Sequence, residues 1–339
     1  VVFDVCESFV EKHGIAPGSH IALQDGEGFM LAVLDVQSVW APDKNAEALA
    51  VYGTDSKDHP GVRYLPDKTA AIYVGGTVRG IQLPESYVFG GYRRSPLQQR
   101  QALLQAGWRK TIAYQTSKII HRLQLEILLK VAKQYRGNIL IQPTIGSTKP
   151  GDTHYYTRVH CYEAALKYFP RRIAMLSLVP LSMRMAGARE SLWYGIIHQN
   201  FGCTHFIVGP NHASPPQAED AAADYSAQDL ILQFSDDLQI EMIAVEEHRY
   251  VAQGDCFEPL SALVQDKGVQ DKGAQGKEAQ GAEQGERFSE RKIQKALHHG
   301  DAIPDWCSFP EVLQEMKKAY PPRAKQGFTV FFTGLSGSG

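Results

Sequence analysis

Apolar residues change their spacing near Gly107, and this change divides the chain into a strand-rich part and a part with alternating strands and helices. Before Gly107, apolar runs bounded by Gly, Pro and Asp predict β-strands at 19–23, 29–33 and 70–74. After it, the predicted strands are 111–114, 139–142, 173–179, 205–209 and 241–245, and the predicted helices are 119–135, 157–169, 189–201 and 218–234. Such alternation predicts a doubly wound parallel α/β sheet with right-handed crossovers.

The segment 264–286 differs in composition from the sequence around it. The pentapeptide Val-Gln-Asp-Lys-Gly occurs twice in succession from Val264, and degenerate copies rich in Ala, Gln, Gly and Glu follow. A repeat with so few large apolar residues cannot bury enough surface to fold, so we expect a disordered, solvated insertion. Beyond it, residues 288–299 and 303–320 have helical patterns.

Polar and glycine-rich sequence follows four of the predicted parallel strands, at 115–121, 146–152, 180–184 and 209–213. In such sheets ligands bind outside the carboxyl ends of the strands, so these four segments predict a ligand site at one rim. His121 and Gln124 share one helix face at the start of the helix that follows the first segment. Free amide groups and the helix dipole favour a phosphate or sulfate there.

The composition limits the possible classes of function. A length of 339 residues predicts two or three domains, and 43% hydrophobic with 21% charged residues is typical of a soluble globular protein. The formal net charge of -2 gives no electrostatic reason to expect a nucleic-acid or membrane partner. The longest apolar run, 173–183, is too short to span a bilayer.

The cysteines and the histidines outside the rim predict ordinary structural roles. The five cysteines form no C-x-x-C pair and no zinc-site spacing, so we expect reduced thiols in the cytoplasm and no tightly bound metal. We expect His205 in the core, His298 and His299 at a helix C-terminus, and His59 in a solvated turn. The chain begins without Met and ends inside a glycine-rich motif, so we expect truncated ends.

The rim segment Q-T-S-K-I-I-H-R-L-Q, residues 115–124, resembles the signature Q-T-R-N-P-x-H-R-A-H of ATP sulfurylases, also called sulfate adenylyltransferases. The residues that match are Gln115, Thr116, His121 and Arg122. Ser117, Lys118 and Gln124 stand where the family has Arg, Asn and the second His.

Further motifs extend the resemblance over nearly the whole chain. Residues 146–152, Arg158 and 161–164 resemble G-x-T-K-P-G-D…R-V-R-C-Y-E-A, and 180–190 resemble P-L-A-M-R-Y-A-G-P-R-E. The run 200–209 nearly matches the family, but Pro210-Asn211-His212-Ala213-Ser214 replaces R-D-H-A-G. The first 85 residues resemble the PUA-like β-rich domain that precedes the sulfurylase core.

The last residues resemble the start of a second enzyme. An apolar run from Gly327 leads into a glycine-rich loop that opens like the P-loop G-x-x-x-x-G-K-[ST]. The loop residues are Gly334, Leu335, Ser336, Gly337, Ser338 and Gly339. This segment is similar to the first strand of adenylylsulfate kinase, which follows a sulfurylase in bifunctional sulfate-activating proteins.

The resemblance implies four domains. These are a PUA-like domain at 1–85, a sulfurylase-like nucleotidyltransferase α/β domain at 86–250, a small, largely helical C-terminal subdomain at 251–322 with the insertion 264–286, and the start of a kinase P-loop domain at 323–339. The expected fold class is therefore α/β, with a Rossmann-like parallel sheet after a β-rich domain.

The resemblance also implies a site and its ligands. The catalytic candidates are His121, Thr116 and Lys118, and the candidates for substrate or nucleotide binding are Gln115, Thr116, Ser117, Lys118, His121, Arg122, Gln124, Met183, Arg184, Gly209, Asn211, His212 and Ala213. The implied ligands are ATP with Mg²⁺, and sulfate or adenylylsulfate. The implied partners are the protein's own kinase domain and further copies in a homo-oligomer.

The substitutions leave three functions open. Attack of sulfate on the α-phosphate of ATP requires cations, because both reactants are highly charged. The losses at 117, 118, 124 and 210–211 favour an inactive or feeble sulfurylase domain that serves the kinase as a scaffold or regulatory nucleotide-binding module. The alternatives are a working sulfate adenylyltransferase with a rebuilt anion site, and a different nucleotidyl transfer that uses Lys118 and Lys149.

Overall fold

The structure is a computed structural model that describes residues 3–84, 88–146, 153–215, 222–263, 285–322 and 327. The chain forms two compact units. Unit 1 contains 1–95, 184–197 and 210–242, and unit 2 contains 96–183, 198–209 and 243–339. Each unit is described by itself.

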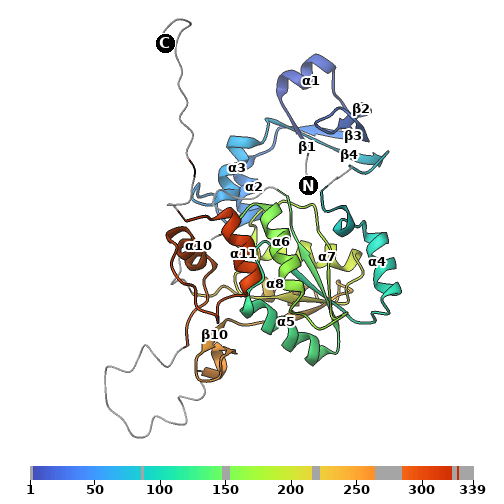
Figure 1. The fold of residues 1–339 in the computed structure, drawn as a ribbon. Coiled ribbons are helices and arrows are strands. Elements are labelled where there is room, and N and C mark those ends of the chain that lie inside the picture. Colours follow the sequence, from blue (N-terminus) through green and yellow to red (C-terminus); the bar gives the residue numbers. More distant parts are fainter. Residues whose placement is uncertain are drawn as a thin grey trace, which may run out of the picture. The chain divides into compact units, whose positions relative to one another are not determined.

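Unit 1 contains a four-stranded antiparallel sheet with the strand order β1-β4-β3-β2 (Figure 1). The strands are β1 (Phe3–Val5), β2 (His20–Gln24), β3 (Met30–Trp40) and β4 (Ile72–Gly80). Its core is Ile21, Leu34, Val36 and Val74. Gly76 lies where a Cβ atom would come within 2.0 Å of the Asp35 carbonyl oxygen, so only glycine fits this crossing of β3 and β4.

Unit 1 also contains helices that the strand pattern did not predict, and these are α1 (Glu7–His13), α2 (Lys44–Tyr52) and α3 (Pro60–Lys68). Asp43 caps α2 by accepting hydrogen bonds from two amide groups of its first turn. His59 caps α3 in the same way, and its Nε2 lies 3.2 Å from the Met185 carbonyl oxygen. The expected solvated turn at His59 is therefore wrong, because the ring is a partly buried helix cap.

The remainder of unit 1 comes from most of α7 (Gly187–Asn200) and from α8 (Ser226–Gln233). Residues 216–221, which include the first four residues of the helix predicted at 218–234, lie outside the described part of the chain.

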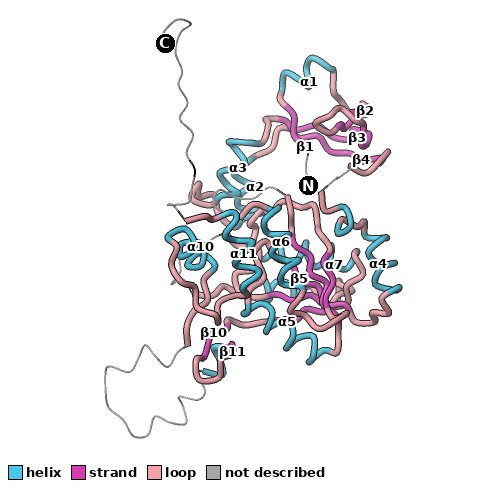
Figure 2. The backbone as a smooth tube through the Cα atoms, viewed as in Figure 1, coloured by secondary structure: helices cyan, strands magenta, loops and turns pink. Residues whose placement is uncertain are grey.

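Unit 2 is built on a parallel sheet with the strand order β7-β6-β5-β8-β9, and Figure 2 labels its central strand, β5. The strands are β5 (Thr111–Thr116), β6 (Asn138–Pro143), β7 (Ala174–Leu176), β8 (His205–Val208) and β9 (Glu241–Ala244). Ile112, Leu140, Ile141 and Phe206 are fully buried in it. The predicted parallel α/β fold is confirmed, although β7 is shorter than the expected 173–179.

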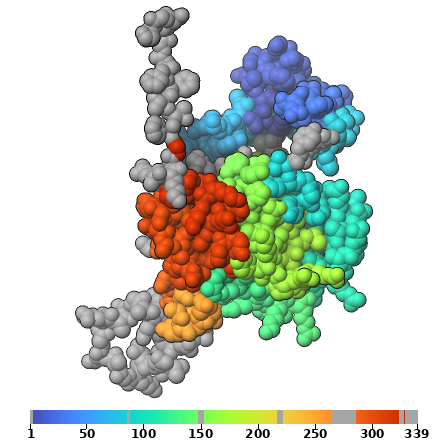
Figure 3. Space-filling view, in the orientation of Figure 1, coloured from blue at the N-terminus to red at the C-terminus, as the bar shows by residue number. Residues whose placement is uncertain are grey.

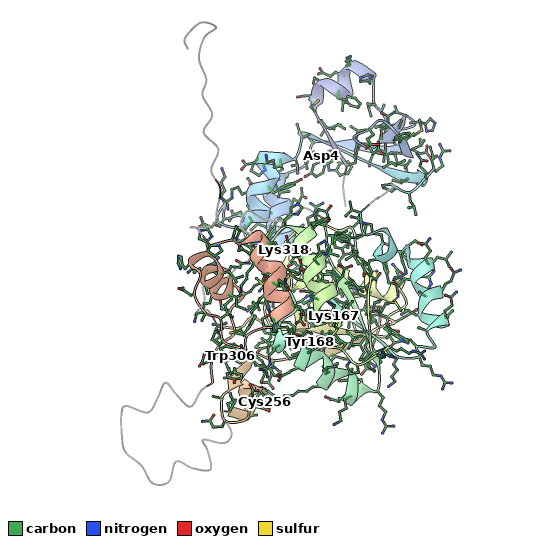
Figure 4. All side chains as sticks on the ribbon, viewed as in Figure 1. Asp4, Lys167, Tyr168, Cys256, Trp306 and Lys318 are labelled. Atoms are coloured by element: carbon green, nitrogen blue, oxygen red, sulfur yellow. The ribbon has the colours of Figure 1, made fainter. Side chains whose placement is uncertain are left out.

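The helices of unit 2 are α4 (Pro96–Gln105), α5 (Arg122–Tyr135), α6 (Tyr155–Leu166), α10 (Glu290–His299) and α11 (Pro310–Ala319). A short 3₁₀ turn, η1 (Gly90–Tyr92), precedes α4 in sequence. Helices α6 and α11 lie side by side, and Figure 3 shows the C-terminal segment packed as one surface against α6. The Tyr168 ring stacks on Phe309 at 3.9 Å between ring centroids, and its hydroxyl donates to Glu311 (Figure 4).

The C-terminal part of unit 2 is not only helical. A hairpin of β10 (His248–Val251) and β11 (Cys256–Pro259) carries Tyr250, which stacks on Trp306 at 4.4 Å (Figure 4). Lys130 on α5 donates to the Phe257 carbonyl, which ties the hairpin to the sheet domain. The largely helical subdomain expected at 251–322 therefore also contains strand β11, whose partner β10 begins before the expected boundary.

Candidate functional site

The turn after β5 is the predicted site segment that the structure describes most completely, and we call residues 115–121 the β5 turn. Gln115 and Thr116 are buried, whereas Lys118 is exposed. Thr116 Oγ1 accepts from the Lys118 amide at 3.0 Å and donates to the Lys118 carbonyl at 3.1 Å. This Thr side chain closes the turn, which places Lys118 at the surface.

Gln124, at the position of the family's second His, has a structural role at the start of α5. Its Oε1 accepts a hydrogen bond of 3.0 Å from the His121 amide. This is one half of a capping box, in which the third helical residue bonds back to the N-cap. The amide oxygen of Gln124 is therefore occupied by the helix end.

His121 is enclosed in unit 2 and does not reach the solvent. Its Nδ1 lies 2.7 Å from the Ser308 hydroxyl, and its ring lies 5.2 Å from that of Phe288. Burial lowers the pKa of His121 to about 3, so the imidazole is neutral near pH 7. No acceptor or donor within the described ranges reaches its buried Nε2 atom.

The two basic residues of this segment differ in their surroundings. Arg122 is held by ion pairs to Glu126 at 3.3 Å and Asp255 at 3.2 Å. The Lys118 ammonium has no hydrogen-bond or ion-pair partner among the residues that the structure describes. Lys118 is therefore the cation of the β5 turn that can approach a ligand.

Two buried glutamines lie side by side where β5 and β6 end. Gln115 and Gln142 are partners in the parallel register. Their Nε2 atoms are both buried, and neither has an acceptor in the described part of the chain. Unpaired buried donors are costly, so these two amides are candidates for contact with a ligand oxygen.

The segment after β8 continues from Gly209 in unit 2 to Asn211, His212 and Ala213 in unit 1. The Asn211 amide donates to the Asp224 carbonyl at 2.7 Å, and Asn211 Oδ1 accepts from the Asp224 amide at 2.9 Å. Asn211 and Ala213 have φ values of 54° and 55°, which lie in the left-handed region. Asn211 is therefore used to fix this loop.

His212 is a second neutral histidine. Its Nδ1 lies 2.7 Å from the Ser191 hydroxyl, and its ring lies 6.2 Å from that of Tyr194. The residue as a whole is half-buried, but its ring contacts Ser191 and Tyr194, which are both buried. Burial of the ring lowers the pKa of His212 to about 4.

Met183 is half-buried and is the last residue of the unit 2 segment 96–183. Arg184 follows it as the first residue of the unit 1 segment 184–197. The buried Glu190 carboxylate accepts from the Arg184 amide at 2.8 Å, the Ala186 amide at 3.0 Å and the Tyr194 hydroxyl at 2.7 Å. The Arg184 side chain remains exposed. A buried carboxylate thus fixes the backbone that presents this arginine.

Sequence reasoning did not assign the residues that support the site segments, which are Arg158, Tyr162, Glu190, Ser191 and Ser308. Arg158, Tyr162 and Glu190 lay within family-like motifs, but nothing in their spacing indicated hydrogen bonds to backbone groups of the rim. Ser308 is 187 residues from His121, and no local pattern connects the two.

Some predicted features lie outside the described residues, namely the rim segment 147–152 with Lys149, the insertion residues 264–284 and the P-loop residues 334–339. Within the described ranges, no three His, Cys, Asp or Glu side chains are arranged to hold a metal ion. No described helix is both long and apolar enough to cross a bilayer.

The fold and the β5 turn define a parallel α/β protein with a polar turn leading into a long helix after the first strand of the sheet. The ATP-sulfurylase family model matches residues 90–319, and the PUA-like domain model matches residues 1–83. The chain belongs to the ATP-sulfurylase family.

Similar proteins include the sulfate adenylyltransferase of Mycosarcoma maydis, 38% identical over 343 residues, and those of Phaeosphaeria nodorum and Yarrowia lipolytica, each 36% identical over 343 residues. Each alignment covers 100% of this chain and 57% of the relative, so the chain spans little more than half the length of these relatives. A structure described as hexameric APS kinase from Thiobacillus denitrificans matches with a TM-score of 0.71 and 28% identity, over 99% of this chain and 56% of that one.

Proposed function

We propose that this chain is the sulfurylase-like part of a bifunctional sulfate-activation protein, with a degenerate site that has little sulfate adenylyltransferase activity. In this role it binds an adenine nucleotide with Mg²⁺ and serves as a scaffold or regulatory module for an adenylylsulfate kinase domain in a cytoplasmic homo-oligomer. The observation that carries the proposal is the state of His121, which is buried, neutral and bonded to Ser308.

The chemistry explains why this observation matters. Attack of sulfate on the α-phosphate of ATP brings two anions together and transfers negative charge to pyrophosphate, so positive groups and hydrogen-bond donors must face the reacting atoms. Ser117 cannot offer the bidentate fork of the family's Arg, and Gln124 is occupied by the helix end. Loss of one such group typically costs about 10²–10³ in rate.

The kinase part of the proposal has separate support. The Thiobacillus denitrificans protein described as hexameric APS kinase contains a region that matches nearly all of this chain. In that protein, the region similar to this chain is part of a longer chain, and the description of that longer chain names a kinase. The glycine-rich residues 334–339 at the end of this chain are consistent with the same arrangement.

An active sulfate adenylyltransferase is the second candidate. The names of the relatives at 36–38% identity favour it, as do the retained Gln115 and Thr116. In this case Lys118, which is exposed, would bind sulfate together with the buried amide of Gln115.

Sulfate-dependent exchange of pyrophosphate into ATP separates the two candidates, with an active fungal sulfate adenylyltransferase as the positive control. We expect exchange at least about 10²-fold below the control, as the loss of one cation or donor predicts. Exchange within tenfold of the control would overturn the proposal in favour of the second candidate. Calorimetry with ATP and with adenylylsulfate then measures nucleotide binding, and Lys118→Met should weaken it.

A further inference from the structure

Two carbonyl groups of the β5 turn accept hydrogen bonds from side chains of α6. Arg158 Nη1 donates to the Ser117 carbonyl at 2.7 Å, and the Tyr162 hydroxyl donates to the Lys118 carbonyl at 2.8 Å. Arg158 and Tyr162 are four residues apart, so they lie on one face of the helix.

Both donors are buried, and Arg158 makes an unusual contact for a charged residue. Arg158 is 2% exposed and Tyr162 is 0% exposed. No carboxylate within the described ranges forms an ion pair with Arg158, and its Nε atom has no acceptor there. Burial raises the pKa of Tyr162, and the positive charge of Arg158 opposes this shift only in part. The Tyr162 hydroxyl therefore stays protonated and can donate.

Burying a guanidinium without a carboxylate is costly, so packing alone does not account for Arg158. Its hydrogen bond is directed at one peptide group of the turn. Trans peptide geometry turns each N–H away from the preceding C=O, so a Lys118 carbonyl directed at Tyr162 turns the Ile119 amide away from α6. The two donors thus determine the orientation of the amides that precede α5.

Of the two amides oriented in this way, that of Lys118 donates to Thr116 Oγ1, and that of Ile119 has no partner in the described part of the chain. Ile119 and Ile120 are 1% and 0% exposed, and no described acceptor bonds to either N–H group. Buried amides are normally paired, and successive free N–H groups before a helix form a concave site for an anionic oxygen. The buried, unpaired Nε2 of Gln115 lies on the same turn.

We propose that Arg158 and Tyr162 are positioning residues that hold the β5 turn with its amide groups presented to a phosphate-type oxygen of the bound nucleotide. The identity of the ligand rests on the proposed function, whereas the clamping of the turn does not. Arg158 provides the buried positive charge behind the turn, and Tyr162 fixes the peptide plane. Neither residue needs to touch the ligand.

The test uses Tyr162→Phe, Arg158→Lys and Arg158→Met in the full chain, with Tyr168→Phe as the matched control. Tyr168 is bonded through its hydroxyl to Glu311, so the control removes a tyrosine hydroxyl bond away from the turn. Hydrogen–deuterium exchange of residues 115–121 is measured without ligand, the Kd for ATP by calorimetry, and the fold by thermal unfolding.

We expect Tyr162→Phe to speed exchange in 115–121 by at least about tenfold and to raise the Kd for ATP about tenfold, which corresponds to the loss of one hydrogen bond. Arg158→Met should have the larger effect, and Arg158→Lys should recover part of it, because a lysine keeps the charge but not the fork. Tyr168→Phe should change neither readout.

Unchanged exchange and unchanged Kd in Tyr162→Phe and Arg158→Lys would overturn the inference. If Arg158→Met does not fold, these two variants decide the matter. If the unmodified protein binds no ATP, the proposed nucleotide binding fails, and the exchange rates alone still decide whether the two residues clamp the turn.

Discussion

The β5 turn and the loop after β8, residues 209–214, follow neighbouring parallel strands but are held in different ways. Each retains a histidine whose Nδ1 lies 2.7 Å from a serine hydroxyl. The turn has no residue with positive φ, and α6 holds its carbonyl groups. The loop contains two left-handed residues other than glycine, Asn211 and Ala213. Side chains of α6 therefore hold carbonyl groups of the turn, whereas the loop is held by bonds to Asp224 and Ser191 and contains two residues in a strained conformation.

The largest expected effect is the dependence of the free energy of unfolding on pH. Folding lowers the pKa of both histidines, and it lowers that of His121 further than that of His212. Their pKa values are about 3 for His121 and about 4 for His212, both below the usual 6.5. The unfolded chain binds more protons below pH 6.5, so the free energy of unfolding should fall as the pH drops. Each group contributes up to about 1.4 kcal/mol per pH unit, or roughly 3 kcal/mol at pH 4.

Urea unfolding at several pH values between 7 and 3 checks this difference. His121→Asn should remove its share of the slope down to pH 3, whereas His212→Asn should remove its share only down to about pH 4. Substitution of the exposed His13 serves as the control. A His121→Asn variant with the full slope of the unmodified protein would contradict the buried, neutral state of His121.

The next effect concerns the carboxylate that supports the Arg184 segment. Glu190→Gln keeps the size of the side chain but turns an amide N–H₂ toward donors that need an acceptor. We expect a loss of about 2 kcal/mol in the free energy of unfolding, because charge-assisted bonds weaken and a buried donor is left unpaired. Glu27→Gln, at an exposed position of the same unit, should change it by less than about 0.5 kcal/mol. Equal effects in the two variants would argue against the support role.

The sequence predicted the sheet of unit 2 because strands buried on both faces have continuous apolar runs, as in Ile139–Ile141. It did not predict α3, because Pro60 and Gly61 have the composition of a turn. Pro60 occupies the first helical turn, where its missing N–H costs nothing, and His59 caps the helix. The Pro-Gly composition therefore predicted a turn at a position where a capping residue and a proline begin a helix.

The candidate site was only partly predictable. The four rim segments follow from the strand pattern, because the carboxyl ends of parallel strands lie at one edge of the sheet. What the side chains do there depends on contacts with distant residues. The contacts of His121 with Ser308 and of Ser117 with Arg158 join positions 187 and 41 residues apart, and neither has a periodic signal.

A smaller effect tests the hydrogen bond between His121 and Ser308. Ser308→Ala removes the hydroxyl 2.7 Å from His121 Nδ1, and a buried nitrogen is left unpaired. We expect the free energy of unfolding to fall by about 1–2 kcal/mol in chemical denaturation. Ser177→Ala is the matched control, since the buried Ser177 hydroxyl has no partner among the described residues. Its loss should cost less than that of Ser308, and the reverse order would contradict the hydrogen bond to His121.

The smallest effect tests the strain in the loop after β8. Ala213 has a φ of 55°, a left-handed conformation that costs an L-residue roughly 1 kcal/mol and glycine almost nothing. Ala213→Gly should therefore raise the free energy of unfolding by a few tenths of a kcal/mol, after the greater flexibility of glycine in the unfolded chain is subtracted. The same change at Ala50, an exposed position inside α2, should lower it by about 1 kcal/mol. Chemical denaturation of the two variants gives the signs directly, and a loss of stability in both would show that the loop is not strained at Ala213.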